Sequence, residues 1–165
     1  VIGMICLSEN LENVDGSGQS SLGFTDEEEI LVASANGFGF RFPISNLCET
    51  TRSGRKIMNL KNEDRMIGFA PVTHNHLFLA TAKGKAVVIA TEQVTQLTAS
   101  GKGVILMKPA DSQLAGIKFV DLKDKVTLTF NTGKDKDISI KSVRLCNRGS
   151  QGVIVSKRKT ILKIT

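Results

Sequence analysis

The sequence predicts an all-β protein built from propeller-like, four-stranded blades, with about three blades in these 165 residues. Short runs of β-branched and apolar residues, bounded by Gly, Asn, Asp or Lys-Gly, are typical of strands, and no segment keeps a helical period beyond one or two turns. An X-Gly pair recurs at 36–37, 83–84 and 132–133, at intervals of 47 and 49 residues. A basic, glycine-rich loop follows each pair by 17 residues. A period in the forties with four strands per unit indicates propeller-like blades.

The expected strands follow one another with short connections. In chain order they are EILVASA (29–35), FGFRFPI (38–44), LFLATA (77–82), KAVVIA (85–90), GVILM (103–107), LAGIKFV (114–120), VTLTF (126–130), DISIKSV (137–143), GVIVS (152–156) and TILKIT (160–165). Each X-Gly pair suits a two-residue hairpin turn, because that turn needs positive φ, which glycine adopts without strain. The short turns ISNL, TEQV and IKSV are the only helical segments that we expect.

Each repeating unit offers four strands: one before the X-Gly turn, one after it, one after the basic loop, and one marked by an apolar-Gly motif. That last motif appears as VIGM (1–4), MIGF (66–69) and LAGI (114–117). One blade cannot cover its own faces, so stacking between neighbouring blades is expected to supply the core. The chain then divides into the last strand of a preceding blade (1–7), a polar acidic loop (8–29) and three blades (30–72, 76–120 and 125–165).

Charge is unevenly distributed along the chain. Seven of the 16 acidic residues lie in the first 30 residues, which contain no Lys or Arg, so all 22 basic residues follow them. A basic surface of this size suits a polyanionic partner, with an ordinary soluble surface as the alternative. The acidic run Asp26–Glu29 is expected to be a solvated loop rather than a metal site.

The sequence offers no tyrosine nucleophile, and its cysteines show no disulfide or zinc-site pattern. It contains no Tyr, and Cys6, Cys48 and Cys146 stand far apart without a Cys-x-x-Cys pair. We expect these cysteines to be buried thiols in a reducing cytoplasm, not a disulfide framework or a zinc site.

The remaining motifs do not support catalysis either. His74 and His76 spell HNH, but they lie in a turn between two strands and not on a ββα unit. The glycine motifs GFG and GKG lack the Gly-Lys-Ser/Thr of a phosphate-binding P-loop. We therefore expect no catalytic residue, metal or cofactor in this chain. No apolar run approaches the roughly 18 residues of a membrane span.

Basic residues recur near the strand ends and loops of all three units. In stacked blades, equivalent loops fall along one perimeter, where a row of cations can follow and bend a phosphate backbone. This wide set comprises Arg41, Arg52, Arg55, Lys56, Lys83, Lys85, Lys102, Lys134, Lys136, Arg148, Lys157, Arg158 and Lys159. Phe38, Phe40 and Phe42 alternate on one strand face and are expected in the core, with Gly39 on the other face. Contacts with the backbone of duplex DNA are therefore favoured over stacking on single-stranded bases.

The recurring pattern resembles that of a known family. An apolar strand, X-Gly-(Phe/Tyr)-Gly-basic, a short turn and Arg-x-x-(Lys/Gln)-Gly-Val-Ile are similar to the C-terminal β-pinwheel of the A subunits of bacterial type IIA topoisomerases. The resemblance is strongest to the A subunits of topoisomerase IV, followed by those of gyrase. It spans about 30–157, and the segments 30–47, 97–108 and 148–154 carry it.

The resemblance implies a non-catalytic domain that binds and bends duplex DNA, with weak sequence preference, and so steers strand passage. It also implies a bacterial, cytoplasmic, nucleoid-associated parent: an ATP-dependent type II topoisomerase that contains two A subunits together with ATPase B subunits. The predicted DNA-binding residues are Arg41, Arg52, Arg55, Lys56, Lys83, Lys85, Lys102, Lys134, Lys136, Arg148 and Gln151. Of these, Lys83, Lys85, Lys134 and Lys136 follow from recurrence, and the others are carried over from the family pattern.

The sequence also departs from the family pattern. The Gln-x-x-Gly-Gly-x-Gly box of gyrase does not occur, which favours topoisomerase IV and modest bending over tight wrapping. Val87-Val88 and Lys136-Asp137 stand where the family often has two basic residues. Two alternatives stay open: a gyrase-type wrapping domain, and a propeller-like platform that binds proteins and not DNA.

Overall fold

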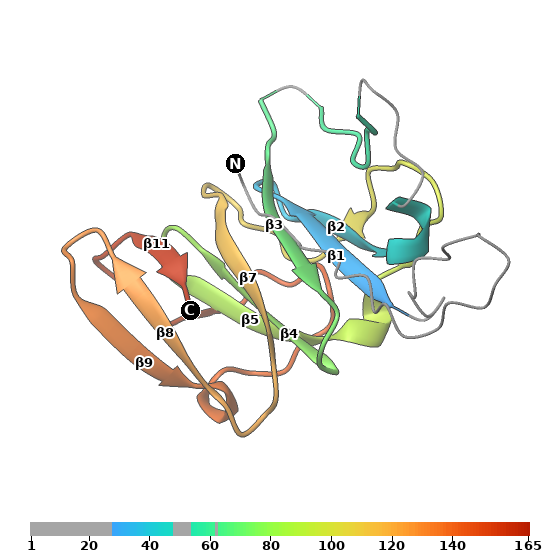
Figure 1. Ribbon diagram of the computed structural model, residues 1–165. Coiled ribbons are helices and arrows are strands. Elements are labelled where there is room, and N and C mark those ends of the chain that lie inside the picture. Colours follow the sequence, from blue (N-terminus) through green and yellow to red (C-terminus); the bar gives the residue numbers. More distant parts are fainter. Residues whose placement is uncertain (1–27, 48–53, 62) are drawn as a thin grey trace, which may run out of the picture.

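The computed structural model describes residues 28–47, 54–61 and 63–165, and these form three antiparallel sheets that follow one another across Figure 1. The first sheet has the order β3 (Met66–Pro71), β1 (Glu29–Ser34), β2 (Phe38–Pro43), β6 (Val104–Ile105). The second has the order β10 (Val153–Ile154), β5 (Lys85–Ala90), β4 (His76–Thr81), β7 (Leu114–Val120). The third contains β11 (Ile161–Ile164), β8 (Lys125–Phe130) and β9 (Asp135–Ser139). The predicted all-β, blade-like fold is confirmed.

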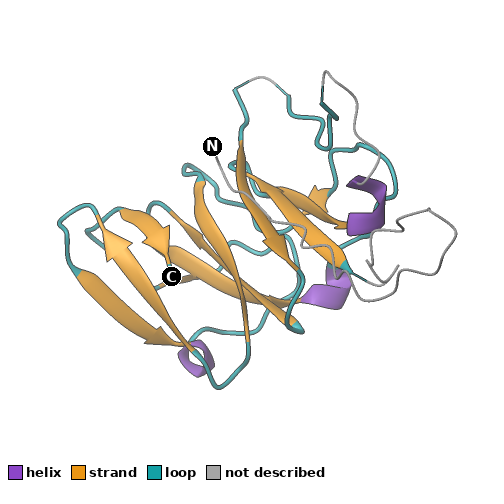
Figure 2. Ribbon diagram, viewed as in Figure 1, coloured by secondary structure: helices purple, strands orange, loops and turns teal. Residues whose placement is uncertain are grey.

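Helical structure in the described residues is limited to three short 3₁₀ turns, drawn in purple in Figure 2. They are η1 (Ile44–Leu47), η2 (Thr91–Gln93) and η3 (Ile140–Ser142), at the three predicted positions. No helix in this part of the chain is long and apolar enough to cross a membrane.

Two of the three core clusters in the described residues lie between neighbouring sheets. Successive residues of β4 point to opposite faces, so Leu77 packs against the first sheet while Phe78 packs against the third. On β2, Phe40 and Phe42 are fully buried in a cluster on the outer face of the first sheet, with Phe38 half-buried beside them. The predicted stacking of blades and the core role of these phenylalanines are therefore confirmed.

Each of the first two sheets is completed by a strand from the following unit. β6 comes after the second basic loop, yet it pairs with β2, matching Gly39 with Val104. β10 comes after the third basic loop and pairs with β5, matching Ala86 with Val153. The expectation that the strand after a basic loop belongs to its own unit is thus wrong. Local sequence periodicity specifies a strand but not its partner, so it gives no sign of the exchange.

The hairpin glycines Gly37 and Gly84 hold the segments that contain β6 and β10 in place. We call each of these two glycines the seat of the strand that comes from the following unit. The carbonyl of Gly84 accepts hydrogen bonds from the N–H groups of Val155 (2.8 Å) and Ser156 (3.1 Å). The carbonyl of Gly37 accepts the equivalent pair from Leu106 (2.8 Å) and Met107 (3.4 Å). Both glycines have positive φ, +85° and +83° for Gly37 and Gly84, as the predicted hairpin turn requires.

The third sheet differs from the other two. Within the described residues no strand pairs with the free edge of β9, and a Cβ added at Gly133 would meet nothing within 4 Å. The outward face of β8 is also more polar than its core face: Thr127 is half-buried there and donates its hydroxyl hydrogen to Asp137 Oδ1 (2.7 Å).

Some sequence-based predictions fall outside the described residues. They are the strand at 1–7, the acidic loop as far as residue 27, Arg52, and the thiols of Cys6 and Cys48. The third thiol, Cys146, is half-buried and packs against the core between the first two sheets.

Candidate nucleic-acid interface

Several basic side chains surround a groove of about 600 Å³ on the third blade. It lies where the turn after β8 meets the segment between β10 and β11. Its lining comprises Phe130, Lys134, Asp135, Lys136, Val155, Ser156, Lys157, Arg158 and Lys159. Five cations therefore face a single carboxylate, and this composition suits an anionic ligand.

Two contacts hold the walls of this groove together. Lys136 Nζ donates a hydrogen bond to the carbonyl of Val155 (3.2 Å). Lys159 Nζ lies 5.5 Å from the ring centroid of Phe130, within range of a cation–π interaction. Both contacts fix the lysine stems while leaving N–H groups that can still bind a phosphate oxygen.

Two further predicted cations, Lys102 and Lys85, lie at related places in the first and second sheets. In the first two sheets, the residue after the hairpin glycine lies beside a residue of the basic loop from the following unit. That loop residue directly precedes the glycine that leads into β6 or β10. In the first sheet this pair is Phe38 and Lys102, with Nζ 3.7 Å from the ring centroid. In the second sheet it is Lys85 and Gln151, with Nζ 3.3 Å from Oε1. One predicted cation therefore lies beside the β2–β6 pair and another beside the β5–β10 pair.

Arg41 has a different environment from the one expected of a DNA contact. Its side chain is 24% exposed, and its NH1 is 2.8 Å from Glu29 Oε2. Its Nε donates to the carbonyl of Val94 (2.8 Å). The guanidinium therefore joins β1, β2 and the turn after η2.

Lys83 is also engaged within the protein, although at the surface. Its Nζ lies 2.5 Å from Asp111 Oδ2. The hydrogen bond from Lys83 lowers the pKa of the Asp111 carboxyl below its ordinary value, and the positive charge of Lys83 acts in the same direction. A phosphate would have to compete with Asp111 for this lysine.

The other predicted residues within the described ranges lie apart from the groove. Arg55 NH1 donates to the carbonyl of Asn46, and its guanidinium lies 5.9 Å from the ring centroid of Phe42. Lys56 and Arg148 are exposed. The backbone N–H of Arg148 donates to Gln93 Oε1 (2.8 Å), which fixes the third basic loop to the second blade.

Of the predicted contact residues that the structure describes, the groove therefore brings together only Lys134 and Lys136. Lys157, Arg158 and Lys159 belong to the wide set of recurring cations but not to the predicted contacts. The signal that could have selected them is their own sequence: three consecutive cations directly before the last strand.

A family model matches most of the chain. It is described as "DNA gyrase C-terminal domain, beta-propeller", and it matches residues 28–73, 75–130 and 138–160.

Curated relatives with detectable similarity are the A subunits of bacterial topoisomerases. That of DNA gyrase from Lawsonia intracellularis is 30% identical over 136 residues, covering 79% of this chain and 17% of the relative. That of DNA topoisomerase 4 from Streptococcus pyogenes serotype M3 is 26% identical over 156 residues, covering 78% and 19%. Its counterpart from Rickettsia bellii is 27% identical over 161 residues, covering 88% and 22%. The chain thus spans about a fifth of the length of these relatives.

Solved structures show the same fold. The structure described as "Crystal structure of the C-terminal domain of DNA topoisomerase IV" superposes with a TM-score of 0.76 at 18% identity, covering 85% of this chain and 46% of that one. The "Structure of the E. coli ParC C-terminal domain" superposes with a TM-score of 0.69 at 19% identity, covering 86% and 61%.

Proposed function

The chain belongs to the family described as DNA gyrase C-terminal domain, beta-propeller, and we propose that it binds the backbone of duplex DNA and bends the duplex along its blades. The observation that carries this proposal is the groove on the third blade, where five cations face one carboxylate. Lys85 and Lys102 supply further positive charge beside the β5–β10 and β2–β6 strand pairs. Successive contacts along a curved array would follow a bent duplex.

The energetics require several contacts at once. Smooth bending of a 20–30 base-pair site costs on the order of 1–6 kcal/mol, so isolated phosphate contacts would not hold the bend. Each contact releases condensed counterions, and the logarithm of the binding constant falls by about 0.9 per log unit of salt for each phosphate neutralised. Lysine and arginine contacts with phosphates carry little sequence information, so weak sequence preference is expected.

We place this activity within a larger enzyme. The relatives are named as A subunits of gyrase and topoisomerase IV, and the chain covers only a fifth of their length. We propose that the chain is the non-catalytic part of one of the two A subunits in such an enzyme. It would act with the other of these two and with the ATPase B subunits, in the bacterial cytoplasm at the nucleoid.

The finer choice between the two enzymes rests on sequence patterns at 30–47 and 97–108, which favour topoisomerase IV. A bending domain and a wrapping domain differ in their effect on DNA topology. We expect that nicked plasmid closed by ligase in the presence of the chain has the same linking number as plasmid closed without the chain. A consistent shift of one sign would instead indicate chiral wrapping, as the gyrase alternative requires.

Fluorescence anisotropy with a labelled duplex tests DNA binding directly. We expect affinity to fall steeply with salt for the unaltered chain, and the slope to shrink when Lys157, Arg158 and Lys159 are all changed to Gln. The matched control changes Lys123, Lys125 and Lys141 to Gln. It removes the same charge at the other end of the β8–β9 hairpin, because Lys125 pairs with Ser139 there. Equal effects of both triple variants would show that the groove cations attract DNA only through the overall positive charge of the chain. Binding that is absent at low salt would favour the protein-interaction platform.

A further inference from the structure

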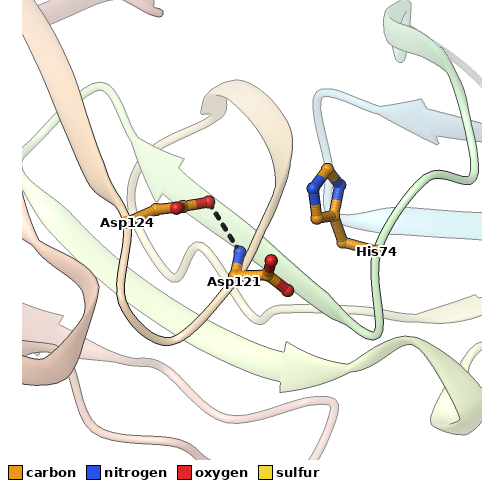
Figure 3. Close-up of side chains that lie close together, drawn as sticks. All are labelled: His74, Asp121 and Asp124. Carbon is orange, nitrogen blue, oxygen red and sulfur yellow. Dashed lines mark hydrogen bonds between the residues drawn. The ribbon is translucent and has the colours of Figure 1, made fainter.

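Three side chains with metal-binding atoms converge at one end of the second sheet, away from the basic groove. His74 lies in the turn 72–75 between β3 and β4, and Asp121 and Asp124 lie in the turn 121–124 between β7 and β8. One ligand atom from each of these residues lies within 4.8 Å of the others. Figure 3 shows the Asp121 carboxylate between the Asp124 side chain and the imidazole of His74.

The two turns occupy equivalent places in the repeat. Each carries the chain from the last strand of one unit to the first strand of the next. They are the entry to and exit from the second sheet, and they meet because His76 of β4 pairs with Val120 of β7. Residues that lie 47 and 50 positions apart in the sequence are thereby brought together.

Hydrogen bonds fix the backbone of both turns. The buried Thr91 donates its hydroxyl hydrogen to the carbonyl of His74 (2.9 Å) and its N–H to the carbonyl of Asn75 (2.9 Å). The N–H of Asp121 donates to Asp124 Oδ2 (2.8 Å), and the N–H of Asp124 donates to the carbonyl of Asp121 (3.0 Å). The Cα positions of the three metal-binding residues are therefore set without any ion.

Two negative charges in this cluster have no positive partner in the described part of the chain. Neither Asp121 nor Asp124 forms an ion pair there, although the chain as a whole carries a formal charge of +6. Lys123 lies between them in sequence, and it forms no ion pair with either carboxylate. In the same turn region, Nδ1 of His74 is 2.7 Å from Thr73 Oγ1, which leaves Nε2 as the imidazole nitrogen that can face a cation.

We propose that His74, Asp121 and Asp124 bind one divalent transition-metal cation, of the Mn²⁺ or Zn²⁺ class. One imidazole nitrogen with two carboxylate oxygens is a donor set for such ions, whereas Mg²⁺ and Ca²⁺ prefer oxygen ligands alone. Two ligands of one ion at about 2.1 Å from it can be at most roughly 4.2 Å apart. Small side-chain rotations at this exposed position would close the remaining distance, and water would complete the coordination.

Such an ion would join the entry and exit turns of the second blade. The first turn connects the first sheet to the second, and the second turn connects the second sheet to the third. A shared ion would therefore restrict both connections together and stiffen the array of three blades.

Paramagnetic broadening by Mn²⁺ in a ¹⁵N-labelled sample of the chain tests this site residue by residue. Substoichiometric Mn²⁺ should broaden the amide signals of 72–76 and 120–125 together. A tenfold excess of Mg²⁺ should not restore them, since the imidazole ligand disfavours Mg²⁺. The double substitution Asp121→Asn with Asp124→Asn should abolish the broadening at both turns, and Asn keeps the oxygen that accepts the turn hydrogen bond. His74→Gln should abolish it as well.

The matched control, Asp135→Asn with Asp137→Asn, removes the same charge from β9 and should leave the broadening unchanged. Broadening of 121–124 alone that survives His74→Gln would overturn the proposal, because the carboxylates would then act without the imidazole. Broadening spread over every exposed acidic residue, or recovery with Mg²⁺, would indicate an adventitious ion only.

Discussion

Gly84 lies so close to Ser156 that a Cβ added at Gly84 would be 2.1 Å from the Ser156 carbonyl oxygen. The same relationship joins Gly37 to Met107, where the distance would be 2.0 Å. These contacts are made by residues just beyond β6 and β10, the strands that each sheet receives from the following unit. A side chain at either position is therefore excluded for two reasons: the positive φ of the glycine and the backbone carbonyl that lies against it.

Gly84→Ala should destabilise the fold much more than Gly133→Ala. Both substitutions place an L-residue at positive φ, which costs about 1–2 kcal/mol. Only the methyl group at position 84 would also press on a backbone carbonyl, and overpacking of this kind adds a further ~1–3 kcal/mol. Urea unfolding of the two variants measures the difference in the free energy of unfolding. Equal losses would show that the seat at Gly84 yields without cost.

Arg41→Gln should lower stability without changing the salt dependence of DNA binding. The substitution removes the ion pair with Glu29, and loss of a hydrogen bond to a charged group typically costs about 1.5–3 kcal/mol. A residue that touches no phosphate leaves the slope of affinity against salt intact. Thermal unfolding and anisotropy titrations at several salt concentrations give the two quantities. A shallower slope would restore Arg41 to the DNA contacts predicted from the sequence.

Lys102→Gln should be tolerated by the fold and should weaken DNA binding. Gln151 already occupies the equivalent position in the second sheet, so the side chain fits there. The slope of affinity against salt should fall by about 0.9 if Lys102 neutralises one phosphate. Phe38→Leu tests the ring beneath it, since a cation–π contact at an exposed site contributes about 0.5–1 kcal/mol. An unchanged slope in Lys102→Gln would exclude this lysine from the interface.

The carboxyl group of Asp111 should titrate at lower pH than an ordinary aspartate. Because its folded-state pKa is depressed by Lys83, its contribution to stability is present above the unfolded-state pKa and disappears as the pH falls through the folded-state pKa. Carbon-detected NMR of the side-chain carboxyl follows the titration directly, and Lys83→Met should move the midpoint upward. A midpoint that Lys83→Met leaves in place would show that the pair in the structure is not maintained in solution.

Asp111→Asn should also increase the affinity for duplex DNA. The substitution releases Lys83 from its partner and raises the net positive charge of this surface. Anisotropy titration should show tighter binding at low salt. Glu92→Gln, at an exposed position outside the proposed metal site and the groove, is a control for net charge alone. A similar gain in that variant would assign the effect to overall charge and not to Lys83.

The sequence was sufficient for the strands, the three 3₁₀ turns and the packing of Phe40 and Phe42, because these depend on patterns over a few neighbouring residues. It predicted strands at β6 and β10 as well, but it was not sufficient to predict which sheet each of them joins. Each is only two residues long, and its partner strand is chosen by contacts far away in the sequence. The repeat suggested where strands would form, while the seat at the hairpin glycine determines which sheet receives them.

The candidate interface depends on side-chain partners that the sequence does not show. The identities of the cations do not show which of them have acidic partners, and Arg41 and Lys83 both do, through Glu29 and Asp111. Glu29 lies on β1, and Arg41 lies on the adjacent strand β2. Writing the two strands of the predicted hairpin opposite each other could therefore have suggested that pair. The partnership of Lys83 with Asp111 depends on a turn 28 residues further along, where no local pattern indicates it.

Strand exchange means that the unit of sequence and the unit of folding are offset by one strand. Truncation of the chain between two repeats would remove one strand from the sheet before the break. Insertion of a whole repeat would add a new hairpin glycine and also a strand that completes the sheet of the preceding repeat. Fraying of β10 would expose Gly84 and the edge of β5 in a sheet whose other strands belong to the preceding unit. Hydrogen exchange in one repeat should therefore respond to substitutions in the next, and the blades should unfold as a chain of linked neighbours and not one by one.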